Sequence, residues 1–222
     1  MKGFIEESCT EEWKEFINSR KKTLKFSKKK AIFKAGEKTQ GLFFIDAGKV
    51  KVTYKQYDGT DRLIRLATQG DILGHRGFGG SWTYPISAYA LEETTISFMS
   101  IDTFNLIVKI NPIFTFRLMM FFAEELRKSE AKIKHYPVKI LVARAIFDNY
   151  KVFGFEEKMN STKLSYTLSR KDLASKAGTT YETVIRSLAD FAKNGIIKLD
   201  GKSIHILDLK KLKALARPQY KK

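Results

Sequence analysis

The sequence predicts an α+β protein with a β-rich N-terminal half and a helical C-terminal part that contains a hairpin. Three observations lead to this fold class. Turn glycines recur at Gly36, Gly48, Gly59 and Gly70, and spacings of 12, 11 and 11 residues suit short strands that roll into a small barrel. An apolar repeat of helical period follows residue 112. Two short helices, a hairpin and a last helix then follow.

Composition limits the class of protein. The 222 residues are 43% hydrophobic, which is ample for a buried core. No apolar run approaches the roughly 18 residues of a membrane helix, and the N-terminus is acidic where a signal peptide would be basic. We therefore expect a cytoplasmic protein without a membrane partner. The single cysteine, Cys9, excludes an internal disulfide and cannot supply the thiolates of an iron–sulfur cluster or a structural zinc site.

The chain is strongly basic, with 41 Lys and Arg against 24 Asp and Glu and a net charge of +17. Residues 137–222 carry 18 basic and 8 acidic side chains, whereas residues 1–136 carry 23 and 16, so the charge is denser in the C-terminal part. Such a field attracts polyanions and predicts nucleic acid as a partner. A lysine-rich solvated surface is the alternative.

The N-terminal half begins with a predicted helix at about Glu11 to Lys21. The lysine-rich run at 21–30 follows, and we interpret it as a solvated linker. From Ala31 to about Met99, short apolar segments alternate with glycine turns, and the turn Asp58-Gly59 predicts a β-hairpin. This segment is predicted to form a β-barrel or roll.

A long helix is predicted after Asp102, with Pro112 at a helix start. Apolar residues repeat along it at spacings of three and four, which favours pairing with its copy in a second subunit. The predicted dimer seam contains Met119, Phe122, Leu126 and Ile133. The alternative is a helix that only covers the barrel, through a second apolar face of Phe116, Met120 and Phe121. A third interpretation is that both faces are used at once.

Pro137 must break or restart a helix, so we place the domain boundary there, between domains 1–136 and 137–222. The C-terminal domain is predicted to contain a helix from Val138, a short strand at 163–167, two short helices and a hairpin that turns at Asp200-Gly201. A last helix is predicted at Leu209 to Ala216. This order is that of a winged helix-turn-helix.

The segment 168–207 carries the most specific motif. Ser169 followed by Asp172 is an N-cap signature, Gly178 supplies a tight turn, and Thr179 or Thr180 caps a second helix.

A helical wheel drawn for the second helix separates its two faces. With Val184 at zero, Leu188 and Phe191 fall at about 40° and −20°, whereas Glu182 and Arg186 fall at about 160° and 200°. An outward Arg can donate two hydrogen bonds to guanine, and an outward Glu can accept one from cytosine. The alternative is that Glu182 completes a capping box with Thr179 and forms an ordinary ion pair with Arg186.

At this motif the sequence resembles the cyclic AMP receptor protein/FNR (Crp/Fnr) family of bacterial transcription regulators. The resemblance covers nearly the whole chain, through "GEKTQGLFFIDAGKVKV", "GDILGHRGF", "NPIFTFRLMMFFAEELRKSEAKI" and "AGTTYETVIRSL". It implies a cyclic-nucleotide-binding-like β-roll (jelly roll), a dimerisation helix at about 112–134 and a winged helix-turn-helix. Glu182 and Arg186 stand at positions that family members use to read bases, and Tyr181 and Ile185 stand at positions that vary between subfamilies. Thr180 and the hairpin lysines Lys198 and Lys202 are expected to contact the DNA backbone.

The resemblance also marks a candidate effector pocket at Gly74, His75, Arg76 and Tyr84. In members that bind cyclic AMP, a Gly-Glu pair contacts the ribose and an Arg-Ser pair holds the phosphate. Here His75 replaces the Glu, and Tyr84 and Pro85 stand where Arg and Ser would be. The loss of a bidentate, charge-assisted contact predicts that cyclic AMP is not the effector. Arg76 could substitute, although an ion-paired or solvent-facing Arg is the ordinary interpretation.

Other functions find little support in the sequence. Cys9 and the three histidines are scattered, and no catalytic motif is present, so no enzyme activity, cofactor or metal is expected. The alternatives left open are a regulator of the same fold that responds to a cyclic nucleotide, or one that senses haem or a metal through His75. The expected partners are double-stranded DNA, a second copy of the chain, RNA polymerase and a small-molecule effector of unknown identity. The sequence does not distinguish an activator from a repressor.

Overall fold

A computed structural model describes residues 9–130 and 136–217. Its contacts divide the chain into two compact units. One contains residues up to 135 without 56–66, and the other contains residues from 136 onward together with 56–66. Each unit is described separately below.

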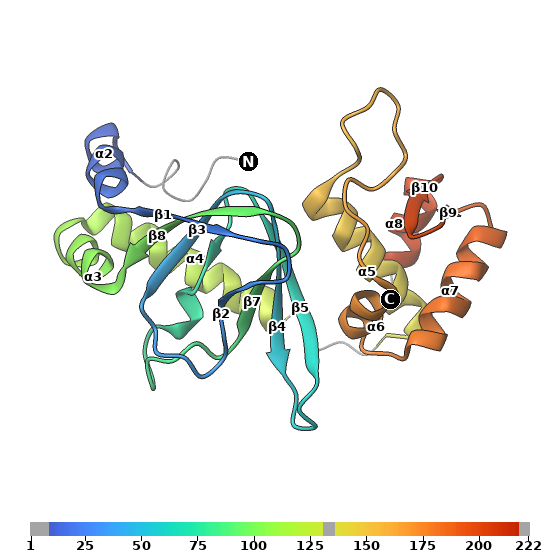
Figure 1. Ribbon diagram of the computed structural model, residues 1–222, viewed down its shortest axis with the longest axis horizontal. Coiled ribbons are helices and arrows are strands. Elements are labelled where there is room, and N and C mark those ends of the chain that lie inside the picture. Colours follow the sequence, from blue (N-terminus) through green and yellow to red (C-terminus); the bar gives the residue numbers. More distant parts are fainter. Residues whose placement is uncertain (1–8, 131–135, 218–222) are drawn as a thin grey trace, which may run out of the picture. The chain divides into compact units, whose positions relative to one another are not determined.

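Residues 22–100 form a β-roll of two four-stranded sheets, as the sequence predicts (Figure 1). The sheets have the strand orders β1-β8-β3-β6 and β2-β7-β4-β5, and the β4–β5 hairpin turns at Asp58-Gly59. A helix precedes the roll at the predicted place, α2 (Glu11–Arg20). The strands are β1 (Lys22–Phe26), β2 (Ala31–Phe33), β3 (Gly41–Ala47), β4 (Lys49–Lys55), β5 (Asp61–Thr68), β6 (Ile72–Leu73), β7 (Ser87–Ala90) and β8 (Thr94–Ser100).

Strand β1 corrects one sequence expectation. The lysine-rich run at 21–30 is not a linker, because Lys22–Phe26 pairs antiparallel with β8 over five residues. Lys22 and Lys25 are exposed, while Leu24 and Phe26 are partly buried. β1 is the first strand in its sheet, and charged side chains on an edge strand discourage pairing with another chain. Lys22 and Lys25, two of the lysines that suggest a solvated linker, are thus side chains of a sheet edge.

Two helices follow the roll, α3 (Ile101–Ile110) and α4 (Pro112–Glu130). Pro112 is the first residue of α4, as predicted, and the Asn111 side chain accepts a hydrogen bond from the Phe114 N–H (2.9 Å) at this helix start. Among the described residues no single helix is long and apolar enough to span a membrane. α3 and Pro112–Arg127 have the length and composition together but are bent by 111°.

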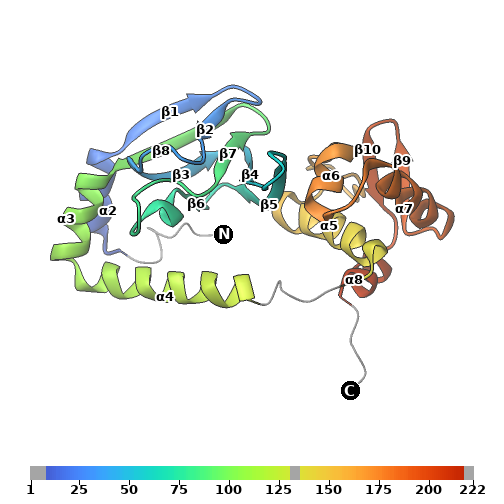
Figure 2. The same cartoon turned by 90° about the horizontal axis from the view of Figure 1, so that it is seen from below.

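Helix α4 lies along the roll with one face buried and one exposed (Figure 2). Phe114 and Leu118 are buried in a core that α2, α3, β3, β6 and β8 also line, and Phe121 and Phe122 are partly buried against it. The opposite face exposes large apolar side chains, namely Ile113, Phe116, Met119, Met120 and Leu126. Phe116 and Met120 therefore do not cover the roll, so the predicted covering face is wrong for these two residues. Its third residue, Phe121, does contact the core.

The C-terminal unit contains α5 (Val138–Phe153), α6 (Arg170–Ala177), α7 (Tyr181–Lys193), the hairpin β9 (Ile197–Asp200) and β10 (Ser203–Ile206), and α8 (Leu209–Ala216). α5 starts after Pro137, and α8 has the predicted bounds. The short strand expected at 163–167 is absent. Within the described residues this segment makes only isolated bridges, Phe155 with Leu164 and Lys163 with His205. The second bridge reaches β10 but does not extend into a ladder of paired residues.

Candidate DNA-binding and effector sites

The helix-turn-helix is set by three short sequence signals. The Ser169 hydroxyl accepts a hydrogen bond from the Asp172 N–H (3.0 Å) and begins α6. Gly178 ends α6 in the left-handed conformation at φ +66°, which a residue with a side chain rarely adopts. The Thr180 hydroxyl then accepts from the Thr183 N–H (3.3 Å) and begins α7. Thr180, not Thr179, is therefore the N-cap of α7.

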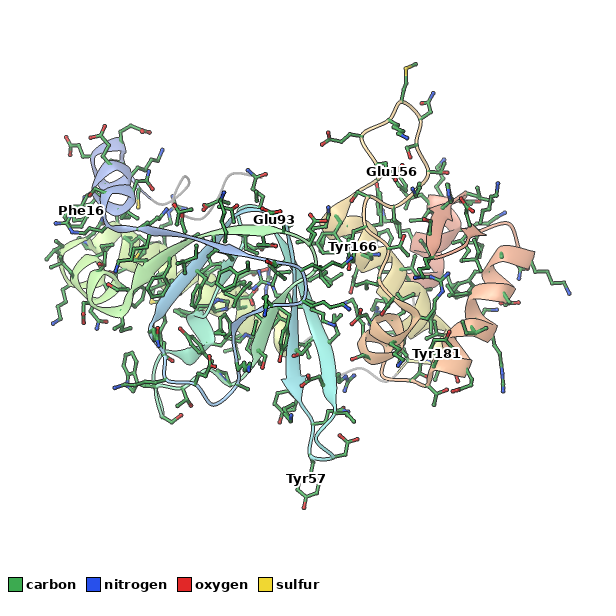
Figure 3. The ribbon with its side chains drawn as sticks, viewed as in Figure 1. Phe16, Tyr57, Glu93, Glu156, Tyr166 and Tyr181 are labelled. Atoms are coloured by element: carbon green, nitrogen blue, oxygen red, sulfur yellow. The ribbon has the colours of Figure 1, made fainter. Side chains whose placement is uncertain are left out.

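The two faces of α7 lie as the helical wheel predicts. Val184, Leu188 and Phe191 are buried, with 0%, 1% and 0% of their surface exposed. Glu182 and Arg186 are exposed, as is Tyr181, which projects from the start of the helix (Figure 3). The buried face anchors α7 in the unit, so its opposite face is available to a partner.

Glu182 stands at the second position of α7. With Thr180 as the N-cap, the capping box that would pair Thr179 with Glu182 does not form. Hydrogen bonds from its own backbone N–H and from the Thr180 side chain hold the pKa of Glu182 below its ordinary value, and the charge of Arg186 lowers that pKa further. The carboxylate is therefore ionised at neutral pH and acts only as a hydrogen-bond acceptor.

The β9–β10 hairpin presents exposed lysines. Lys198 and Lys202 flank the turn at Asp200-Gly201, and both are exposed. The Arg170 guanidinium donates to the carbonyls of Lys202 (3.3 Å) and Gly201 (3.5 Å). Arg170, at the first position of α6, thus ties the hairpin turn to the helix-turn-helix. Its sequence signal is an Arg directly after the N-cap Ser169, which by itself does not indicate a contact with the hairpin.

The interaction of Tyr84 with the backbone is the main feature of the effector region. Tyr84 is 2% exposed, and its ring stacks on Phe33 at 4.3 Å between centroids. Its hydroxyl accepts from the N–H groups of Gln40 (3.0 Å) and Gly41 (3.3 Å) and donates to the Gly41 carbonyl (3.2 Å). Burial raises the pKa of this phenol above its ordinary value.

Gly74 and Gly77 lie directly against the Tyr84 ring. Gly74 precedes a 3-10 turn, η1 (His75–Gly77), and has φ +87°. A Cβ atom at Gly77 would come within 2.3 Å of the Thr39 hydroxyl and 2.8 Å of the Tyr84 ring. The glycine at 77 is therefore required by the close approach of the turn to neighbouring side chains.

The other predicted pocket residues face α4. His75 is 4% exposed, its ring lies 5.1 Å from Phe121 and 5.9 Å from Phe122 between centroids, and its Nε2 lies 3.9 Å from a Glu125 carboxylate oxygen. Arg76 forms an ion pair with the same carboxylate oxygen at 3.5 Å. Arg76 is thus ion-paired, and Glu125 is a partner that the sequence analysis did not identify. The turn is joined to the long helix through these contacts.

The predicted dimer seam is divided by the structure. Met119 and Leu126 are 57% and 62% exposed, whereas Phe122 is partly buried against the core and His75. Ile133 lies outside the described residues. The exposed apolar face of α4 is therefore centred on Phe116, Met119, Met120 and Leu126, rotated from the predicted seam.

A winged helix-turn-helix with an exposed polar face on its second helix, carried on the same chain as a β-roll, defines a DNA-binding transcriptional regulator. Comparison with known proteins agrees. Residues 142–215 match the family described as "Crp-like helix-turn-helix domain", and residues 23–111 match the family described as "Cyclic nucleotide-binding domain". The chain belongs to the Crp/Fnr family of transcriptional regulators.

Curated relatives match most of the chain. The chain is 28% identical over 195 residues to a CRP-like cAMP-activated global transcriptional regulator of Mycobacterium tuberculosis. The match covers 86% of this chain and 87% of the relative. It is 25% identical over 194 residues to the transcriptional activator protein anr of Pseudomonas aeruginosa, covering 85% and 78%. These relatives are transcriptional regulators and not enzymes. The fold is similar to that of FixK2 from Bradyrhizobium japonicum, with a TM-score of 0.76, 19% identity and coverage of 90% and 99%.

Proposed function

We propose that this protein binds an inverted-repeat DNA site as a homodimer, reads bases through Glu182 and Arg186, and responds to an effector other than cyclic AMP. The observation that carries the proposal is the outward face of α7, where an ionised Glu182 and an exposed Arg186 stand opposite a buried face. Because the proposed target is DNA, we place this protein in the cytoplasm, with RNA polymerase as a further partner.

The chemistry of the two side chains defines what they read. Arg186 can donate two parallel hydrogen bonds to O6 and N7 of guanine, and the Glu182 carboxylate can accept from N4 of cytosine. Both residues lie in the first two turns of α7, the part of a recognition helix that contacts base edges. Lys198 and Lys202 on the hairpin, and Thr180 at the helix start, are expected to contact phosphates.

The exposed face of α4 supports the dimer. Phe116, Met119 and Leu126 are each more than half exposed on one helix, and burial against a copy removes this apolar surface from water. A two-fold axis between the copies requires an inverted repeat. The pitch of DNA then places half-site centres about 10–10.5 base pairs, or roughly 34 Å, apart.

The packing of Tyr84 supports an effector other than cyclic AMP. Its position is the one where the family resemblance places the phosphate-binding Arg, and here it holds a buried ring stacked on Phe33 and hydrogen-bonded to backbone. The nearby cation, Arg76, is engaged by Glu125. The Mycobacterium relative is named as cAMP-activated, and the proposal gives the present protein a different effector.

Base reading is tested by comparing Arg186→Ala with Lys193→Ala, an exposed cation at the end of the same helix. Each is titrated against a site obtained by unbiased selection and against a scrambled sequence. We expect Arg186→Ala to cost about 1–3 kcal/mol at the selected site and to leave scrambled DNA nearly unaffected. Lys193→Ala should change both DNAs alike. Equal weakening of both DNAs by Arg186→Ala would contradict the proposal.

The effector proposal is tested by calorimetry with cyclic AMP and by an absorbance spectrum of the purified protein. We expect no micromolar binding of cyclic AMP and no change in DNA affinity when it is added. Micromolar binding coupled to tighter DNA binding would show that Arg76 or a rearranged turn holds the phosphate. A Soret band would favour haem sensing through His75.

A further inference from the structure

The outward face of α7 carries an apolar ridge beside the polar one. Tyr181, Ile185 and Ala189 follow one another at intervals of four residues, so they line up along the helix, and all three are exposed. Glu182 and Arg186 form the neighbouring ridge with the same spacing. Tyr181 is 46% exposed and Ile185 is 41% exposed. An isoleucine on the face that meets DNA needs an apolar partner to gain from burial.

The major groove offers one such partner. The groove edges of the bases carry hydrogen-bonding groups, and the C5-methyl of thymine is the apolar group among them. We infer that Ile185 packs against a thymine methyl in each half-site and thereby selects thymine at that position, an inference that rests on the proposed DNA-reading role of α7. Tyr181 is less suited to this selection, because its phenol ends in a polar group.

The position of the selected thymine follows from helix geometry. Consecutive residues are separated by about 100° around an α-helix and about 1.5 Å along its axis. Ile185 and Arg186 therefore meet base edges that lie within about two base pairs of one another. A β-branched side chain in a helix is held in one dominant rotamer, so Ile185 presents its methyl groups with little loss of freedom on binding.

The test uses the full-length protein and its selected site. Each thymine is replaced in turn by deoxyuridine, which removes the methyl and keeps the base pair. For the wild type we expect one thymine per half-site, within two base pairs of the guanine read by Arg186, at which this change weakens binding about fourfold. Changing both half-sites should weaken binding about 15-fold.

Variants assign the effect to Ile185. Ile185→Ala should bind the thymine site about as weakly as the wild type binds the uracil site, and it should not distinguish the two. Leu207→Ala removes an aliphatic side chain of the same unit that is 53% exposed and lies outside α7, and it should keep the full thymine preference. Circular dichroism confirms that both variants are folded.

Two failures can be told apart. If Ile185→Ala retains the wild-type response to every uracil substitution while Arg186→Ala loses its guanine preference, the thymine contact is wrong and the proposed function stands. If neither variant alters any base preference, α7 does not read the site and the proposed function fails as well. The inference is supported if Ile185→Ala loses the response to uracil while the control Leu207→Ala keeps it.

Discussion

Replacing Tyr84 with Phe tests whether the effector region is built around this buried phenol. The substitution keeps the ring on Phe33 but deletes the acceptor for the N–H groups of Gln40 and Gly41 and the donor to the Gly41 carbonyl. Gln40 is exposed, so water can replace the lost partner there, whereas Gly41 is buried. The N–H and the carbonyl of Gly41 both lose their bond to the phenol. One buried group left without its partner costs about 1–3 kcal/mol, and we expect the free energy of unfolding to fall by at least that amount.

The same substitution should change the alkaline pH dependence of stability. Burial raises the pKa of Tyr84 in the folded state above the unfolded value of about 10. A group with a raised folded pKa contributes stability that is present below the unfolded pKa and is lost as pH rises through the folded pKa. The stability advantage of the wild type over Tyr84→Phe should therefore be full at pH 7 and shrink above pH 10 or so.

Urea unfolding followed by tryptophan fluorescence measures this effect in the right unit. The two tryptophans, Trp13 and Trp82, both belong to the N-terminal unit. Tyr57→Phe is the matched control, because Tyr57 is fully exposed and its loss should leave stability unchanged. Equal stability of Tyr84→Phe and wild type at pH 7 would refute the reasoning. A constant difference between the two across the alkaline range would refute the pH argument.

Three further predictions address the dimer, the hairpin and the recognition helix. Leu126→Glu places a charge on the exposed face of α4 and should yield monomers with lost DNA binding in analytical ultracentrifugation and titration; an unchanged dimer would place the interface elsewhere. Lys202→Ala should weaken binding to all sequences alike and lower the slope of log affinity against log salt by about one. Phe191→Ala removes a fully buried ring from α7 and should cost about 3–5 kcal/mol of stability in the C-terminal unit, measured by unfolding followed by circular dichroism. A much smaller loss would contradict the burial of that face.

Several elements could be predicted because their signals are local. The bounds of α8, the start of α4 at Pro112 and the capped start of α6 at Ser169 depend on residues close together in the chain. The outward position of Arg186 follows from the helical period once α7 is recognised. Strand β1 could not be predicted, because its lysines resemble those of a linker and its pairing partner β8 is about 70 residues away in the sequence.

The sequence by itself determined the order of elements, the helix-turn-helix and the residues on the outward face of α7, because helix periods, caps and turns are encoded within a few residues. Only the tertiary structure decided which face of α4 packs on the roll, since two apolar faces of similar character compete and the long-range contacts of Phe114 and Leu118 select one. It also decided what fills the effector region. The burial of Tyr84 and the contacts of His75 and Arg76 with Glu125 join segments about 40 to 50 residues apart, and no local pattern records such contacts.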